Sequence, residues 1–263
     1  AVATRSTLPV LSNILLETQT PTSLRIAAMN MEIAISTTID AHIDESGAIT
    51  LPARLLLDLV KAFPKERIDL ELNHRTQTVT LICGRNKATL KGIDAQEFPI
   101  IGQFDASIAI PGANVQQLDL APATLGRLVQ QTAFAAATDE SRPILAGIYT
   151  VLAEGRLTLV AVDGFRLATA SAAIEDAAAA AFSANIPAGA YQRLAALIDH
   201  LKPDDDSNLH FAFFPERNQI MVKLGGTELI AQTIEGNYPD YRRIIPNGKA
   251  TTLQVATADL LKA

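Results

Sequence analysis

The stretch NYPDYRRIIP, at residues 237–246, decides how the rest of the chain is organised. Pro239 and Pro246 have no backbone N–H to donate, so this stretch is predicted to be an ordered connector outside any sheet. A weaker copy, AQEFPII, lies at residues 95–101, and in both places an aromatic residue and a proline follow a strand-like run. The pair indicates that the chain repeats itself.

Three pairs of landmarks agree on the period of the repeat. Each pair consists of two prolines or two leucines in similar surroundings, and the separations are 187 − 52 = 135, 143 − 9 = 134 and 253 − 118 = 135 residues: Pro52 and Pro187, Pro9 and Pro143, Leu118 and Leu253. A period of this length predicts duplicated domains, because solenoid repeats run about 20 to 50 residues.

The register of the repeat predicts the domain boundaries. We expect a first domain over residues 1–115 that lacks its opening helix, a complete second domain over residues 116–249, and the start of a third over residues 250–263. The chain is therefore expected to be a fragment of a protein with three repeats.

Composition bounds the class of protein. At 263 residues and 48% hydrophobic, the chain can bury a sizeable core and is expected to divide into two domains. It contains no run of 18 apolar residues that would predict a membrane span. The single cysteine, Cys83, excludes an internal disulfide framework, fits a reducing cytoplasm and is predicted to be a buried strand residue. The formal charge of −6 argues against nucleic-acid binding by the whole surface but allows a basic stripe on one face.

Each complete repeat is predicted to run helix, three strands, strand, helix, three strands, which is an α+β layer architecture of antiparallel sheets with two helices together on one side. Helices are expected from Pro52 to Phe63, from Pro122 to Phe134 and from Pro187 to Leu201, and residues 102–117 read as a linker. In the first helix, apolar residues follow at helical spacing and are expected to face inward: Leu55, Leu56, Leu59, Val60 and Phe63. Basic residues are expected on the outward faces of the helices: Arg54, Lys61, Arg127, Arg193 and Lys202.

Motifs for catalysis, cofactors and metals are missing from the sequence. There is no phosphate-cradling glycine loop, no dinucleotide fingerprint and no nucleophile elbow, so no cofactor is expected. The four histidines have no metal-ligand spacing, and Asp204, Asp205 and Asp206 read as a solvated turn, so no metal site is expected either. The sequence predicts a protein that is not an enzyme.

A second informative stretch, VAVDGFRLA at residues 160–168, contains the turn dipeptide Asp163-Gly164 between two strand-like runs. Together with residues 237–246 and with RSTLPVL at residues 5–11, it resembles the bacterial DNA polymerase III beta subunit family, the sliding clamps. The resemblance covers almost the whole chain, and the combination of three motifs at matching repeat positions is specific.

The resemblance implies a cytoplasmic processivity factor of DNA replication. In this family, duplicated clamp domains form a head-to-tail homodimeric ring with helices that line a hole around duplex DNA. The ring tethers the replicative polymerase and catalyses nothing itself, although it is catalogued with the DNA-directed DNA polymerase, a nucleotidyltransferase. Its partners are duplex DNA, bound without sequence preference, and the polymerase, clamp loader and repair proteins, bound through short peptide motifs.

The resemblance also implies site residues. Arg5 and Arg54 match positions that touch DNA, and Ala88 and Leu90 match the edge of the subunit interface. The positions that match the peptide groove are Arg142, Leu145, Val162, Gly164, Phe165, Arg166, Leu167, Pro239, Arg243 and Ile244. Phe165 stands where members of the family often have a histidine, and Ala88 stands where they have a larger apolar residue.

Two other functions are compatible with the sequence alone. One is an enzyme with duplicated domains whose active site lies outside this chain. The other is a peptide-binding scaffold unrelated to DNA. Restoring the missing termini would test the first alternative, and loading onto DNA would distinguish a clamp from the second.

Overall fold

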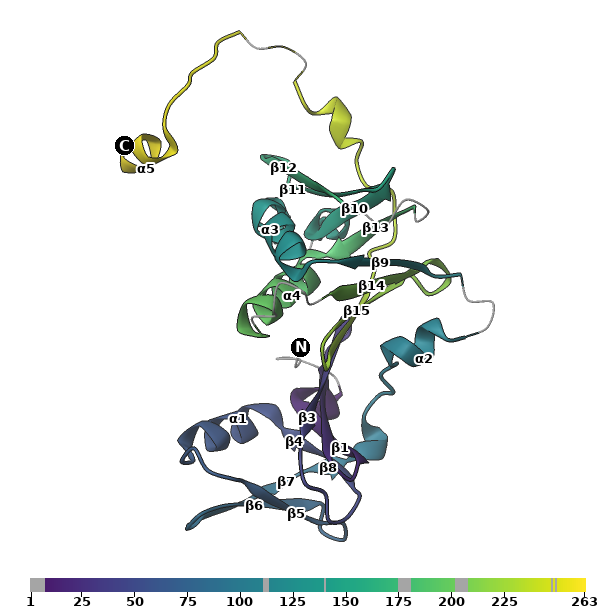
Figure 1. The fold of residues 1–263 in the computed structure, drawn as a ribbon, viewed down its shortest axis with the longest axis vertical. Helices are drawn as coiled ribbons and strands as arrows, with labels where there is room; N and C mark the ends of the chain where they lie inside the picture. The colour runs from purple at the N-terminus through teal and green to yellow at the C-terminus, as the bar shows by residue number, and fades with distance from the viewer. Residues whose placement is uncertain are drawn as a thin grey trace.

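The computed structural model describes residues 8–110, 114–139, 141–174, 181–201, 208–246, 248 and 250–263. Its helices and strands form two repeats of an α+β unit that are joined edge to edge through their strands (Figure 1). The predicted fold class is confirmed. No helix within the described ranges is long and apolar enough to cross a membrane.

The first repeat consists of a strand meander, one helix and a second meander. After the short 3₁₀ helix η1 (Pro9–Ser12), its elements are β1 (Asn13–Thr20), β2 (Ser23–Met29), β3 (Ile33–Asp40), β4 (Ala48–Pro52), α1 (Ala53–Ala62), β5 (Asp69–Asn73), β6 (Thr78–Cys83), β7 (Asn86–Lys91), β8 (Ile93–Asp94) and η2 (Ala95–Glu97). Cys83 is fully buried on β6, as the sequence predicts.

The second repeat has the same order with an additional helix at its start. Its elements are β9 (Gln116–Leu120), α3 (Pro122–Thr132), η3 (Ala133–Ala135), η4 (Pro143–Ala146), β10 (Gly147–Ala153), β11 (Arg156–Val162), β12 (Leu167–Ala173), β13 (Phe182–Pro187), α4 (Ala188–Leu201), β14 (Leu209–Phe214), η5 (Pro215–Arg217), β15 (Gln219–Leu224) and β16 (Thr227–Gln232). The chain continues through η6 (Tyr241–Arg243) to a short helix, α5 (Thr257–Lys262), which extends away from the repeats (Figure 1).

One antiparallel sheet of nine strands crosses the boundary between the repeats. Its order is β8-β4-β1-β2-β3-β16-β15-β14-β9, so β3 of the first repeat pairs with β16 of the second. Ile35 lies opposite Leu229, and the hydroxyl groups of Thr37 and Thr227 are hydrogen-bonded at 2.9 Å. Each repeat adds a smaller sheet, β5-β6-β7 in the first and β12-β11-β10-β13 in the second.

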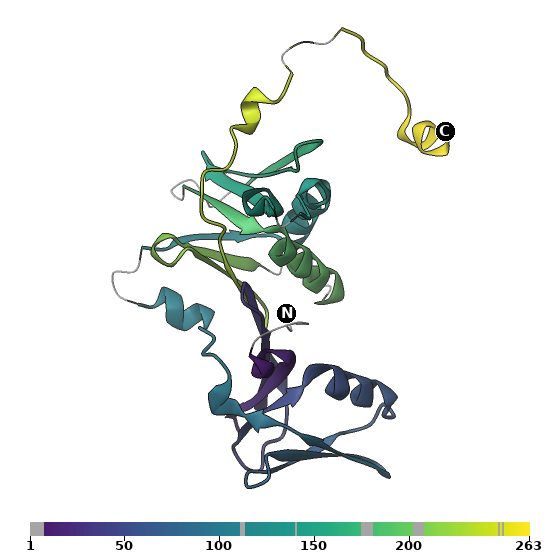
Figure 2. The same cartoon turned by 180° about the vertical axis from the view of Figure 1, so that it is seen from behind.

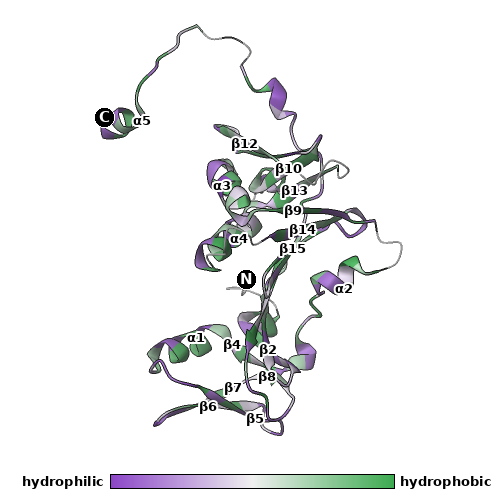
Figure 3. Ribbon diagram, in the orientation of Figure 1, coloured by the Kyte–Doolittle hydropathy of each residue, from purple (hydrophilic) through white to green (hydrophobic). Residues whose placement is uncertain are grey.

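The largest hydrophobic core belongs to the second repeat, where α3 and α4 pack against each other and against both sheets. On α3, Leu125, Leu128, Val129 and Thr132 share one face at helical spacing, and all four are buried. Tyr191 of α4 is also buried, and its hydroxyl lies 2.7 Å from that of Thr150. Both the strands and the helices around this core carry hydrophobic and hydrophilic residues (Figure 3).

The helix α1 is covered less completely than the sequence predicts. Among its residues only Ala53 is buried, and Leu55 and Val60 are 55% and 43% exposed, so the expectation that both face inward is wrong. In the second repeat α3 covers α4, but the described part of the first repeat contains no second helix beside α1. The outward positions of Arg54 and Lys61 agree with the prediction.

The linker between the repeats is more structured than predicted. Residues 102–117 contain the short helix α2 (Phe104–Ile108) and the first residues of β9. Phe104 of α2 is buried, and it packs against strands of both repeats. A periodicity search misses so short a helix because it makes less than two turns.

Candidate peptide groove on the second repeat

A tightly bonded turn joins β11 to β12. One carboxylate oxygen of Asp163, Oδ1, accepts hydrogen bonds from the backbone N–H groups of Phe165 and Arg166, both at 2.9 Å. Arg166 Nε donates to the other oxygen, Oδ2, at 2.9 Å. Gly164 has a φ of +97°, a conformation that residues with a side chain rarely adopt. The turn is therefore fixed by the residues Asp163 and Gly164 that the sequence singled out.

The same bonds shift the titration of Asp163. The backbone N–H groups of Phe165 and Arg166, assisted by the Arg166 guanidinium, hold the pKa of the Asp163 carboxyl below its ordinary value, because they stabilise the charged form. The turn is accordingly stable at neutral pH, where this carboxylate is ionised.

The turn presents aromatic surface to solvent. The side chain of Phe165 is fully exposed, and the guanidinium of Arg166 lies over the ring of Phe134, 5.8 Å from its centroid. Phe134, in η3 at the end of α3, is itself 58% exposed. Phe134 was not among the predicted groove residues. The sequence could have indicated it, because it is an aromatic residue directly after the buried face of a helix.

Apolar side chains lie beneath the turn. Val162, at the end of β11, is buried and stands opposite the half-buried Leu167 on β12, while Leu145 is buried in η4. The guanidinium of Arg142 lies close to the turn, because Nη1 would be 3.3 Å from a Cβ placed on Gly164. The structure thus places Arg142, at the start of η4, beside the β11–β12 turn.

The segment after β16 forms the second side of the site. Ile234 N donates to Asn185 O at 2.7 Å, and the ring of Tyr238 stacks on that of Tyr149 with centroids 4.9 Å apart and planes 7° apart. Tyr238 Oη also donates to Val160 O at 3.4 Å, and burial raises the pKa of Tyr238 to about 12. In Figure 2, this segment runs along the sheets of the second repeat as far as η6.

Two predicted groove residues lie beyond this packed region. Pro239 directly follows Tyr238, but Arg243 and Ile244 are in and after η6, where Ile244 is 54% exposed. Arg243 Nε pairs with Asp240 Oδ2 at 3.0 Å. The other eight positions lie at η4, at the β11–β12 turn and directly after Tyr238, and Ile244 is an exposed apolar side chain farther along the chain.

Two of the three arginines in the site are partly neutralised. Arg166 and Arg243 are each paired with an aspartate three residues earlier, whereas within the described residues no carboxylate is within salt-bridge distance of Arg142. The charge of the Asp139 carboxylate, three residues earlier, nevertheless interacts with Arg142, so each of the three arginines has an aspartate nearby.

The other predicted sites are at different places on the molecule. Arg54 is exposed at the start of α1, and Arg5 lies outside the described residues. Ala88 and Leu90 are on β7, an edge strand of the three-stranded sheet, where Leu90 is buried and Ala88 is partly exposed. Arg193 is half-buried and donates to Gly189 O, and Lys202 lies outside the described residues.

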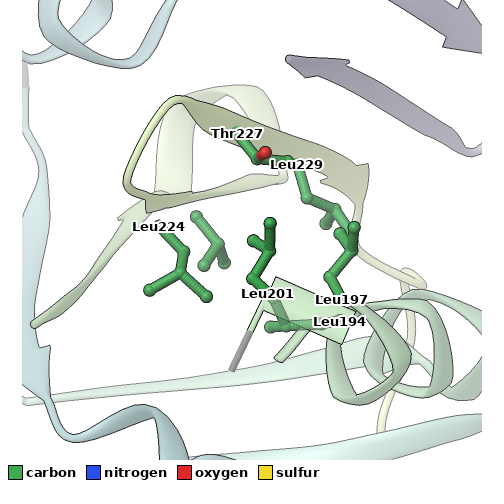
Figure 4. Close-up of a pocket in the computed structure, with 7 residues that line it drawn as sticks. Leu194, Leu197, Leu201, Leu224, Thr227 and Leu229 are labelled. Atoms are coloured by element: carbon green, nitrogen blue, oxygen red, sulfur yellow. The ribbon is translucent and has the colours of Figure 1, made fainter. Parts of the chain in front are cut away.

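The described residues contain no cluster of three or more histidine, cysteine, aspartate or glutamate side chains that would hold a metal ion. A shallow hollow lies between α4 and the β15–β16 hairpin, and Figure 4 shows its leucine side chains facing one another. Its lining is Leu194, Leu197, Leu201, Val222, Leu224, Thr227 and Leu229. Because Thr227 is the single polar side chain among these residues, the hollow lacks the converging polar groups of a catalytic site.

We expect the turn to control the groove. Asp163→Ala removes the acceptor of two backbone N–H groups and the partner of Arg166, and it should weaken binding of a short apolar peptide about fivefold. Asp163→Asn keeps one acceptor oxygen and should retain most of the affinity. The measurement is fluorescence anisotropy of a labelled peptide; equal losses for both variants would contradict the role of the turn.

The effect of Asp163 should depend on pH in a defined direction. Because the pKa is lowered in the folded state, the contribution of the turn is present above the ordinary value of 3.8 and is lost as the pH falls through the lower folded value.

Comparison with known proteins agrees with this geometry. The family model of the DNA polymerase III beta subunit, N-terminal domain, matches residues 1–102, and that of the DNA polymerase III beta subunit, central domain, matches residues 119–240. The beta sliding clamp of Staphylococcus aureus is 28% identical over 270 residues, a match that covers 100% of this chain and 67% of the relative.

The similar solved structures are likewise DNA polymerase III beta subunits or sliding clamps. The DNA polymerase III subunit beta from Pseudomonas aeruginosa has a TM-score of 0.81 and 28% identity, and the DNA polymerase sliding clamp from Bacillus subtilis has a TM-score of 0.80 and 25% identity. Each match covers 94% of this chain but 63% of the solved chain, so the chain spans less than two thirds of the length of these structures.

Proposed function

Since the chain belongs to the DNA polymerase III beta subunit family, we propose that it is part of a sliding clamp that encircles duplex DNA and tethers the replicative polymerase. The clamp is a cytoplasmic processivity factor of DNA replication and carries out no reaction of its own. Its domains are residues 1–115, 116–249 and, as the opening of a third, 250–263.

The edge-to-edge joining of the repeats is the observation that carries this proposal. β3 pairs with β16, so one sheet continues from repeat to repeat. Figures 1 and 2 place α1, α3 and α4 along one side of the molecule. Further repeats added by the same kind of strand pairing would extend a layer of helices backed by sheets, and a heterologous contact of this kind can close into a ring.

Contact with DNA would come from the helical side. Arg54, Lys61 and Arg127 are exposed there, whereas the formal charge of the whole chain is −6. A few basic side chains on the helical side of an acidic protein attract DNA phosphates without specific contacts to the bases. Binding should therefore be independent of DNA sequence and weakened by salt. Arg54, together with Arg5, is proposed to touch DNA.

The groove would receive the partner proteins. Its buried apolar floor, its exposed aromatic and isoleucine side chains and its nearby arginine suit a short hydrophobic peptide with a polar or acidic flank. The polymerase, the clamp loader and repair proteins are the proposed partners through such motifs.

Closure of the ring would use the free edge of the first repeat. In the duplication, β7 of the first repeat corresponds to β16 of the second, and β16 pairs with β3 of its neighbour. Ala88 and Leu90 on β7 are therefore proposed to lie at the interface with another subunit in a head-to-tail homodimer.

Loading onto DNA tests the function. We expect a protein that carries these two repeats followed by a complete third repeat to sediment as a dimer and, when loaded on nicked circular DNA, to slide off after the circle is linearised. Release independent of linearisation, or a monomer at micromolar concentration, would contradict the proposal. No polymerase, nuclease or ATPase turnover should accompany the protein; metal-dependent turnover that copurifies with it would also contradict it.

A further inference from the structure

The internal duplication pairs the exposed Ile244 of the groove with a buried residue of the first repeat. Phe98-Pro99 corresponds to Tyr238-Pro239, with an offset of 239 − 99 = 140 residues. The same offset places Phe104 at the position of Ile244. Ile244 is 54% exposed, whereas Phe104 is 4% exposed.

The turn beside the groove is duplicated as well. Asn30 Oδ1 accepts hydrogen bonds from the backbone N–H groups of Glu32 and Ile33 at 2.9 and 2.7 Å, the same pattern that Asp163 makes after β11. Met31 at the tip of this first turn is 79% exposed, as Phe165 is fully exposed at the tip of the second. The junction of the two repeats therefore has the parts of a groove.

Phe104 fills the apolar part of this junction. It belongs to a cluster with residues of both repeats: Ala34 of β3, Ala212 and Phe214 of β14, Met221 of β15 and Ile230 of β16. Its ring also lies 6.3 Å from that of His210. A phenyl ring thus occupies an apolar pocket that strands of two domains form together.

Polar contacts hold the start of α2 in place. The backbone N–H of Phe104 donates to Glu228 Oε2 at 3.2 Å, and Lys223 Nζ donates to Asp105 Oδ2 at 2.5 Å. Asp105 is largely exposed, so this pair lies at the rim of the pocket. The junction therefore holds an aromatic side chain followed by a carboxylate.

We propose that the junction is a second peptide site and that the linker helix α2 is its built-in ligand. The comparison of this site with the groove rests on the proposed function. The burial of Phe104 in its apolar pocket is independent of that function. The site takes a peptide with an aromatic residue followed by an acidic one. Because a tethered ligand acts at an effective concentration that is millimolar for a short linker, it excludes free peptides and leaves one open groove in the two repeats.

Two variants open the site in different ways. Phe104→Ala removes the buried ring, and Asp105→Lys breaks the rim ion pair without making a cavity and leaves Lys223 available to a free peptide. The probe is a labelled peptide with the sequence of residues 102–110, GQFDASIAI. We expect both variants to bind the probe at least tenfold more tightly than the unchanged chain does.

The controls test whether probe binding is specific to the junction. Glu97→Lys changes an exposed charge just before the linker and should leave probe binding at the level of the unchanged chain. A probe with alanine in place of its phenylalanine should not bind. Folding of each variant is checked by far-UV circular dichroism, and Asp105→Lys keeps the test valid if Phe104→Ala unfolds.

Two results would overturn the inference. One is failure of the folded Asp105→Lys variant to bind the probe more tightly than the unchanged chain does. The other is loss of probe binding when Ile244→Asp is added, since the probe would then occupy the groove. Failure of a polymerase-derived peptide to bind the unchanged chain would instead count against the proposed function alone.

Discussion

Ile244→Asp is expected to lower the affinity for a polymerase-derived peptide at least tenfold. Ile244 is an exposed apolar side chain at the end of η6, and it is proposed to contact the apolar anchor of the peptide. An aspartate at this position would place a carboxylate against the apolar anchor of the peptide, and desolvating an unpaired charge is costly. The tenfold loss corresponds to about 1.4 kcal/mol, from an affinity near micromolar, or about −8 kcal/mol.

Fluorescence anisotropy with a labelled C-terminal peptide of the polymerase measures this effect. Lys65→Asp makes a larger change of charge on an exposed residue of the first repeat, far along the chain from the groove, and should leave the affinity nearly unchanged. Equal affinities for the unchanged chain and Ile244→Asp would show that the groove does not include Ile244.

Gly147→Ala should lower the free energy of unfolding by about 3 kcal/mol. A Cβ on Gly147 would lie 2.0 Å from Asn185 Oδ1, so the buried Asn185 side chain would have to move. Asn185 Nδ2 donates to Ile144 O at 2.8 Å, and moving it would leave that carbonyl without this hydrogen bond. Overpacking of a core and loss of a buried hydrogen bond each cost about 1 to 3 kcal/mol.

Urea denaturation followed by circular dichroism checks this prediction, and Gly126→Ala is the matched control. Gly126 lies inside α3, where a Cβ would have Ile198 Cγ2 at 3.9 Å, an ordinary contact. Because alanine is a better helix former than glycine by about 1 kcal/mol, this change should be neutral or stabilising. Equal stabilities for Gly147→Ala and the unchanged chain would mean that Asn185 can move freely.

The duplication could be predicted from sequence because equivalent residues of the two repeats are separated by a nearly constant number of residues. The period of 134 or 135 residues does not depend on which strands pair. The pairing of β3 with β16 could not be predicted, since an edge strand such as residues 33–40 reads the same whichever neighbour completes its hydrogen bonds. Periodicity assigned Leu55 and Val60 to a core, but burial depends on what packs against α1.

The sequence predicts the candidate groove as a set of residues and not as a surface. Asp163-Gly164 identified the turn, but its two N–H bonds to one carboxylate oxygen and the packing of Arg166 on Phe134 depend on tertiary geometry. Phe104 was missed for the same reason: in residues 102–117 it reads as one aromatic residue in a polar linker. Its burial comes from β3 and from three strands more than 100 residues later.

The pairing of β3 with β16 also has a consequence for synthesis of the protein. The hydroxyls of Thr37 and Thr227 are 190 residues apart in the chain, so β3 emerges from the ribosome long before its partner does. At about 5 to 20 residues per second, this edge stays unpaired for roughly 10 to 40 seconds. An exposed apolar edge recruits other strands, so the nascent first repeat is a natural client for a chaperone until β16 arrives.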